Sequence, residues 1–126
     1  ARAVVTDVCV PISRLAEAVD ATIAEIAESP IPGPILGHVG DGNYHAILLL
    51  DPDEPEEKDI ALKLQSKMVN RAQEMGGTAT GEHGVGMGKL GYMDAEHGSA
   101  WGMMADIKRA LDPTGIMNPG KLVRQN

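Results

Sequence analysis

The sequence predicts an α+β fold, in which helices cover one face of an antiparallel sheet and a further helix follows near the C-terminal end. Two observations carry this prediction. Strand-like and helix-like segments follow one another in the order β-α-β-β-α-β, and a tight-turn signal joins the two middle strands. This order is typical of the split βαβ, or ferredoxin-like, arrangement. A chain of 126 residues is long enough for a core, so we expect a single domain over residues 1–126.

The first strand and the first helix are marked by a change in apolar spacing. Residues 4–10 are mostly apolar and end at Pro11, which favours a core strand. Ser13 is a suitable N-cap for the helix that follows, because its hydroxyl can accept a backbone N–H of the first turn. Apolar residues then recur at helical spacing: Leu15, Val19, Ile23 and Ile26. The segment 29–33, Ser-Pro-Ile-Pro-Gly, ends this helix.

Residues 34–39 and 44–50 are the two strands of a predicted hairpin. The Asp41-Gly42 pair between them is a strong two-residue turn signal, since glycine accepts positive φ and aspartate tolerates it. Both strands are largely apolar on both faces. We therefore expect the sheet to be covered on one side and to contact something on the other.

The predicted turn brings two histidines together. If Gly40 pairs with Asn43 across it, His38 lies directly opposite His45 on one face of the hairpin, with Cβ atoms ~5 Å apart. A lone buried histidine is usually a satisfied core residue. Two unpaired imidazoles in a core would be unfavourable, so the pair indicates contact with a metal ion or an anionic substrate.

The second half of the chain predicts two more helices and one short strand. Residues 51–55 begin a helix that ends at Gly76-Gly77, and its buried face is marked by Ile60, Leu64, Met68, Ala72 and Met75. Residues 78–80 are β-prone and are expected to form the fourth strand. A last helix runs from Asp94 to Asp112-Pro113, and it is expected to carry these residues inward: Ala100, Met103, Met104, Ile107, Ala110 and Leu111.

A glycine-rich loop over residues 81–88 carries Glu82 and His83. The short strand before it can lie in the same sheet as the hairpin, so this loop can reach the histidine pair. Two histidines and one carboxylate form a common metal set that leaves positions open for a substrate. Adjacent residues of an extended chain point opposite ways, so one of the two can bind the metal while the other turns to a substrate. The loop lacks the Gly-Lys-Ser/Thr ending of a phosphate-binding loop.

Composition excludes several classes of function. A net charge of −7 and a pI of about 4.9 argue against nucleic-acid binding, which needs a basic face. With one cysteine the chain has no disulfide framework, which fits a reducing compartment. No run approaches the ~20 apolar residues of a membrane span. Because the chain starts with Ala-Arg-Ala and passes directly into a core strand, we expect it to be a fragment of a longer protein.

Several motifs resemble the C-terminal domain of FAD-linked oxidases of the vanillyl-alcohol-oxidase type. They occur in the family's order: Thr6 to Leu15; Gly37-His38-Val39-Gly40-Asp41-Gly42-Asn43-Tyr44-His45; Gly76-Gly77-Thr78; Gly81-Glu82-His83-Gly84-Val85-Gly86; Leu111-Asp112-Pro113; and Met117-Asn118-Pro119-Gly120-Lys121. Within that superfamily the chain is most similar to the branch of cytochrome-dependent D-lactate dehydrogenases and the glycolate oxidase FAD subunit. Val5 and Thr6 precede Asp7, where the related hydroxyglutarate branch has a lysine, and this disfavours a long dicarboxylate substrate.

The resemblance implies roles for individual residues. The implied ligands of a divalent metal, zinc or manganese, are His38, His45 and Glu82. His83 is implied as the catalytic base, and Asn118 and Lys121 lie in a stretch that passes near the flavin. FAD itself is held mainly by an N-terminal domain that this chain lacks, so the isolated chain is expected to be inactive.

The reaction implied by the resemblance is the oxidation of D-lactate or glycolate to the 2-keto acid, with hydride transfer to FAD. The implied partners are the protein's own N-terminal FAD domain, a small 2-hydroxyacid and a cytochrome- or quinone-linked electron acceptor. The isolated fragment can dimerise through its exposed sheet face. We expect a cytoplasmic location or one peripheral to the inner membrane, which is mitochondrial in a eukaryote.

Two other interpretations stay open from the sequence. The motifs can form a structural metal module without catalysis, in which case removing the metal unfolds the domain. The chain can also be a metal-dependent hydrolase with Glu82 as base, which requires that Glu82 does not bind the metal.

Overall fold

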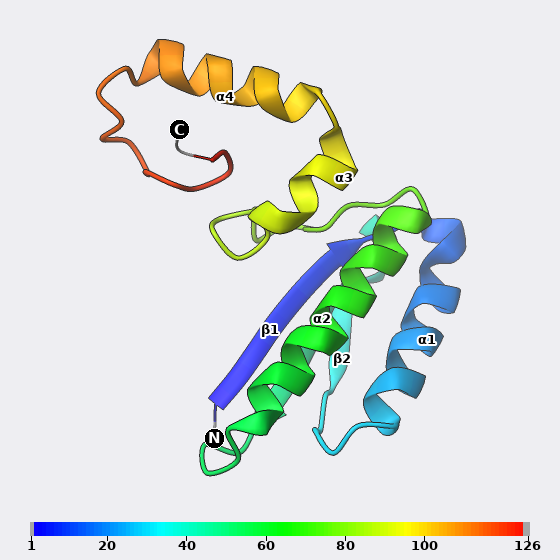
Figure 1. The fold of residues 1–126 in the computed structure, drawn as a ribbon. Helices are drawn as coiled ribbons and strands as arrows, with labels where there is room; N and C mark the ends of the chain where they lie inside the picture. The colour runs from blue at the N-terminus through cyan, green and yellow to red at the C-terminus, as the bar shows by residue number, and fades with distance from the viewer. Residues whose placement is uncertain (1, 125–126) are drawn as a thin grey trace. The chain divides into compact units, whose positions relative to one another are not determined.

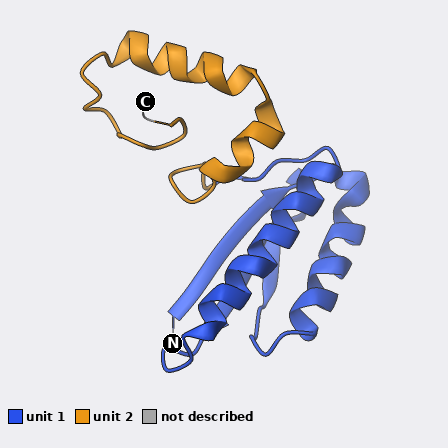
Figure 2. Ribbon diagram, in the orientation of Figure 1, with its two compact units in different colours: residues 1–82 blue, residues 83–126 orange. Residues whose placement is uncertain are grey.

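A computed structural model describes residues 2–124 and divides the chain into two compact units, Ala1–Glu82 and His83–Asn126 (Figure 2). The first unit carries the sheet and two long helices, and the second carries two shorter helices and a tail. Among the described helices, each is too short or too polar to cross a membrane.

The first unit has the α+β architecture that the sequence predicts. Three antiparallel strands, β1 (Arg2–Cys9), β2 (Ile35–His38) and β3 (Asn43–Leu50), lie in the order β1-β3-β2. The helix α1 (Leu15–Ala27) connects β1 to β2, and β3 lies between these strands, which makes a split βαβ unit. The helix α2 (Glu56–Glu74) follows β3, and both helices lie on the same side of the sheet (Figure 1). The α+β class is confirmed.

Alternation along the strands places one face of the sheet in the core. The strand side chains on this face are almost fully buried: Thr6, Val8, Tyr44, Ala46 and Leu48. The helices cover them with Ala18, Ile26, Leu64, Met68 and Val69. On the opposite face, Val5, Leu36 and Leu49 remain exposed. The core of the first unit therefore lies between one face of the sheet and the two helices that cover it.

The hairpin between β2 and β3 differs from its predicted register by two residues. His38 pairs with Asn43, and Leu36 pairs with His45, so the predicted pairing of Gly40 with Asn43 is wrong. A shift of two residues leaves each side chain on its face, because side chains alternate with a period of two. His38 and His45 are therefore diagonal neighbours on one face instead of direct opposites.

The register follows from the shape of the turn. Val39–Asp41 forms a 3-10 turn, and Gly42 follows in a left-handed conformation with φ 73°. The Gly42 carbonyl accepts the N–H of Val10 at 2.9 Å, which ties the turn to the end of β1. A Cβ atom at Gly42 would lie 2.1 Å from the Val10 carbonyl oxygen, so only glycine fits there. The Asp41-Gly42 signal marks a turn, but the turn needs four residues.

The predicted fourth strand, residues 78–80, is reduced to one isolated bridge between Thr78 and Cys9. These two residues exchange both backbone hydrogen bonds, at 2.8 and 3.3 Å. The chain then leaves the ladder, and the N–H groups of Gly81 and Glu82 donate to the side chain of Asp7. A side-chain acceptor thus satisfies these two N–H groups after the bridge.

The helix α1 begins later than predicted and buries a different stripe. Ser13 lies within a 3-10 turn, Ile12–Arg14, and Arg14 takes the N-cap position of α1. Ile23 is exposed, whereas Thr22 is buried, so the expectations for Ser13 and Ile23 are wrong. The buried threonine is satisfied, because its hydroxyl donates to the Ala18 carbonyl at 2.8 Å.

The second unit contains α3 (Met93–His97) and α4 (Ala100–Leu111), followed by a tail. The sequence predicts one helix here, but Gly98 breaks it with φ 52°. The inward residue of α4 is Trp101, whose Nε1–H donates to the Leu122 carbonyl at 2.8 Å. Five of the six predicted inward positions are wrong, because they are exposed: Ala100, Met103, Ile107, Ala110 and Leu111. The tail packs along the side of α4 that carries Trp101. This side is more polar than the side predicted to face inward.

Asp112, at the end of α4, holds this tail in place. Its carboxylate accepts the N–H of Ile116 at 3.1 Å and of Met117 at 2.9 Å, and it receives the ammonium of Lys108. The Lys108 ammonium, and then the Met117 N–H, hold the pKa of Asp112 below its usual range. One carboxylate therefore orders the first residues after the helix.

Candidate metal centre

Two histidines lie on the sheet face that the helices leave open. His45 is on β3, paired with Asp7 of β1 on one side and Leu36 of β2 on the other. His38 ends β2, and its side chain is 62% exposed, whereas that of His45 is only 6% exposed. The ring centroids are 6.1 Å apart and the rings are nearly perpendicular, at 84°. The structure thus places one imidazole in the sheet and one at its rim.

Glu82 completes this group from the loop after α2. Its Oε1 atom lies 3.1 Å from His45 Nε2 and 3.5 Å from His38 Nε2. Ligand atoms of the three residues all lie within 4.8 Å of one another. Two imidazole nitrogens and one carboxylate oxygen form a donor set that suits zinc or manganese and leaves coordination positions free. The glutamate side chain is half exposed, so a small ligand can reach the group from solvent.

Asp7 also lies beside this group, although it is not among the site residues predicted from the sequence. It is 1% exposed, and its Oδ2 atom accepts the N–H of Gly81 at 2.6 Å and of Glu82 at 2.9 Å. The Thr80 hydroxyl lies 3.5 Å from the same oxygen. A signal for Asp7 does exist in the sequence, since it is the one charged residue of the mostly apolar segment 4–10.

Asn43 of β3 lies against the same loop. It is almost fully buried, and its Nδ2 donates to the Val8 carbonyl at 3.1 Å. A Cβ atom added to Gly81 would lie 1.5 Å from that Nδ2 atom. Gly81 is therefore required by a close approach of backbone to side chain, and not by its own dihedral angles.

The other predicted site residues belong to the second unit. His83 follows Glu82 directly and is exposed, and its assignment as base stays a prediction. Asn118 and Lys121 lie in the tail, where the Lys121 N–H donates to the Asn118 carbonyl at 3.3 Å. Both side chains are exposed. Their place near the flavin stays a prediction.

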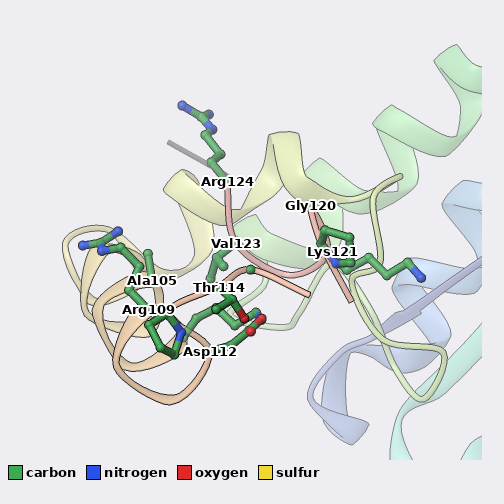
Figure 3. A pocket seen from close by; sticks show the side chains of 12 residues that line it. Ala105, Arg109, Asp112, Thr114, Gly120, Lys121, Val123 and Arg124 are labelled. Carbon is green, nitrogen blue, oxygen red and sulfur yellow. The ribbon is translucent and has the colours of Figure 1, made fainter. Parts of the chain in front are cut away.

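A cavity of about 340 Å³ lies between α4 and the tail of the second unit (Figure 3). Four cationic residues are among those that line it: Lys108, Arg109, Lys121 and Arg124. Lys108 is already bound to Asp112. Figure 3 shows the side chains of Arg109, Lys121 and Arg124 extending in different directions, away from Asp112. These charges do not converge, so the cavity does not present a built anion site.

Comparison of the chain with known proteins identifies its family. Residues 1–122 match the family described as FAD linked oxidases, C-terminal domain. The chain is 45% identical over 119 residues to the probable mitochondrial D-lactate dehydrogenase of Danio rerio, which covers 94% of this chain and 24% of that protein. It is 46% identical over 122 residues to the mitochondrial D-lactate dehydrogenase [cytochrome] of Arabidopsis thaliana, with 96% and 22% covered.

A bacterial relative has a different name. Glycolate oxidase subunit GlcD of Escherichia coli (strain K12) is 36% identical over 111 residues, which are 87% of this chain and 20% of that protein. The chain spans about a fifth to a quarter of the length of these curated relatives. The extent of the family match decides the assignment: the chain belongs to the FAD linked oxidases and corresponds to their C-terminal domain.

Proposed function

We propose that residues 1–126 are the substrate- and metal-binding domain of an FAD-dependent D-2-hydroxyacid dehydrogenase that oxidises D-lactate or glycolate to the 2-keto acid. The observation that carries the proposal is the convergence of His38, His45 and Glu82, with ligand atoms within 4.8 Å. The names of the relatives, D-lactate dehydrogenase and glycolate oxidase subunit, supply the substrate class.

In this proposal His38, His45 and Glu82 hold a divalent cation, zinc or manganese. A bound divalent cation supplies a Lewis acid that lowers the pKa of a hydroxyl group placed on it. His83 accepts the substrate hydroxyl proton on an imidazole nitrogen, a role that suits histidine near neutral pH. FAD supplies the hydride acceptor, and residues outside this chain hold most of it, with Asn118 and Lys121 at the rim of its site.

The role of His83 is tested in the longer protein that carries this chain and its flavin. Reduction of the flavin by D-lactate is followed in His83→Ala and in His97→Ala, a matched histidine of the same unit. We expect His83→Ala to slow reduction by at least about 100-fold, since general base catalysis contributes that much, with metal content unchanged. His97→Ala keeps the wild-type rate. Unchanged reduction in His83→Ala would reject His83 as the base.

The substrate is tested in the same protein by comparing turnover of D-lactate, glycolate and D-2-hydroxyglutarate. The absence of a lysine before Asp7 leads us to expect the poorest turnover with D-2-hydroxyglutarate. A clear preference for D-2-hydroxyglutarate would contradict this part of the proposal.

A structural metal module is the competing function, and the buried core argues against it. The core of the first unit is built from sheet and helix side chains such as Val8, Leu48 and Met68, all almost fully buried on the face opposite the histidines. A domain with such a core does not need a metal to fold, unlike small zinc modules. We expect a chelator to remove the metal with little change in the melting temperature. Unfolding on chelation would favour the structural module.

We further propose that the domain works beside its own FAD domain and passes electrons to a cytochrome- or quinone-linked acceptor. Mitochondrial names among the eukaryotic relatives support a mitochondrial location if the source is a eukaryote. Sedimentation of the 126-residue chain tests whether the exposed sheet face also pairs two copies.

A further inference from the structure

We infer that Asp7 is a positioning residue of the metal centre: its carboxylate fixes the backbone from which Glu82 reaches the two imidazoles. This inference rests on the proposed metal site. Asp7 acts through the backbone of Glu82 and does not itself need to bind the metal. Both residues belong to the first unit.

Asp7 lies beside the site within the sheet. It is on β1 and pairs directly with His45 of β3, so both side chains share the open face. At 1% exposure a carboxylate is costly unless hydrogen bonds satisfy it. The structure satisfies it with backbone N–H groups of the loop after α2. The burial of the Asp7 carboxylate therefore depends on the N–H groups of this loop. The conformation of the loop in turn depends on Asp7.

The hydrogen bonds fix the peptide unit that leads into Glu82. One oxygen, Oδ2, accepts two consecutive N–H groups, from Gly81 at 2.6 Å and from Glu82 at 2.9 Å. Hydrogen bonds to a charged acceptor are about twice as strong as neutral ones. Two such bonds to one atom set both the position and the orientation of the Glu82 backbone.

The same loop also lies close against the neighbouring strand β3. The Gly81 backbone lies so close to Asn43 that a Cβ atom would reach 1.5 Å from Nδ2. Asn43 is itself held by its bond to the Val8 carbonyl. The loop is thus bonded to β1 and lies against β3, beside His45.

Positioning matters here because the Glu82 side chain is half exposed. An exposed glutamate samples several rotamers, and ordering it on binding costs conformational entropy. A fixed backbone limits where its carboxylate can go, so that Oε1 stays near both His Nε2 atoms. Residues that orient metal ligands change metal affinity by about 10–100-fold when they are removed.

The test is a titration of the 126-residue chain with Mn²⁺, by calorimetry and by the EPR spectrum of the bound ion. Asp7→Ala is expected to weaken Mn²⁺ binding by about 10–100-fold. Asp7→Asn is expected to weaken it less, because its amide oxygen can occupy the place of Oδ2 and accept both N–H groups. Glu82→Ala is expected to weaken binding at least as much as Asp7→Ala.

The double variant separates positioning from a general structural role. If Asp7 acts through Glu82, then Asp7→Ala changes the Mn²⁺ affinity of Glu82→Ala by less than about two-fold, because coupled residues are not additive. An equal loss in both backgrounds overturns the inference, since it would mean direct ligation or general destabilisation. Asp20→Asn, on the exposed side of α1, is the matched control and keeps the wild-type affinity.

The outcomes for the metal site and for Asp7 are distinct. Wild-type affinity in Glu82→Ala overturns the proposed site and the inference together. Loss in Glu82→Ala with wild-type affinity in both Asp7 variants overturns the inference alone. Circular dichroism without metal checks folding. If Asp7→Ala does not fold, Asp7→Asn is used instead, because it retains the size of the side chain and an acceptor oxygen. Its effect on Mn²⁺ affinity is then compared between the wild-type and Glu82→Ala backgrounds.

Discussion

Each of the two units uses a buried aspartate to order a segment without regular structure, but the scaffolds behind them differ. In the first unit Asp7 projects from a strand and accepts the N–H groups of Gly81 and Glu82. In the second, Asp112 ends a helix and accepts those of Ile116 and Met117. The ordering aspartate is therefore held by a three-stranded sheet in one unit and by a single helix end in the other.

The difference lies in what fixes the aspartate. The sheet of the first unit is backed by α1 and α2 and by a continuous set of buried side chains. In the described part of the second unit, few apolar side chains are buried: Met93, Trp101 and Val123. Functional groups that must be held closely are better placed on a rigid scaffold. The candidate metal ligands, His38, His45 and Glu82, accordingly come from the first unit.

The largest expected effect comes from removing core volume in the first unit. Leu48 is 1% exposed on the helix-covered face, and Leu48→Ala should reduce the free energy of unfolding by about 2–5 kcal/mol. Leu111 in the second unit is 78% exposed, and Leu111→Ala should change it by no more than about 0.5 kcal/mol. Urea denaturation measures both. Equal losses of unfolding free energy in the two variants would show that the first unit does not have the better-packed core.

A smaller effect is expected from filling the space beside Gly81. Gly81→Ala forces Asn43 to move from its bond with the Val8 carbonyl, and it should cost about 1–3 kcal/mol as overpacking does. Mn²⁺ affinity should fall with it. Gly88→Ala in the second unit is the matched control, because a Cβ there meets nothing within 4 Å. If thermal melting and calorimetry give the same values for both variants, the close approach has no energetic role.

The smallest effect concerns Asp112 and depends on pH. Its pKa is lowered by Lys108 and the Met117 N–H, so the stability it contributes is present above the unfolded value of about 3.9 and is lost as pH falls below it. Asp112→Asn should therefore differ from wild type at pH 7 and converge with it at lower pH. Fluorescence of Trp101, the one tryptophan of the chain, reports the second unit during acid titration. A difference that is the same at low and neutral pH would contradict the assignment.

The sequence predicts the part of the site that depends on alternation and turn chemistry. The two histidines share a face as expected, although the register differs by two residues, because a slip of two preserves the faces of the sheet. The size of the turn could not be predicted, since it depends on a long-range bond from Val10 to Gly42. Glu82 lies beside the histidines as the loop argument predicts, and its role as a ligand stays a prediction.

The parts that the sequence does not predict depend on packing between distant segments. The inward face of α4 follows Trp101 because the tail lies along it, whereas apolar spacing favours Met103 and Ile107. The fourth strand ends after one bridge, and the Asp7 side chain accepts the N–H groups of Gly81 and Glu82 that follow it. Local patterns carry no information on either contact.

The most direct test of the metal centre is a crystal structure of the 126-residue chain with Zn²⁺, with anomalous diffraction measured at the zinc edge. We expect one ion at ~2.0–2.2 Å from a nitrogen of His38, a nitrogen of His45 and a carboxylate oxygen of Glu82. We also expect Asp7 to accept the N–H groups of Gly81 and Glu82 in that structure. No ion at these three residues, or an ion there that Glu82 does not ligate, would rule out the proposed metal centre.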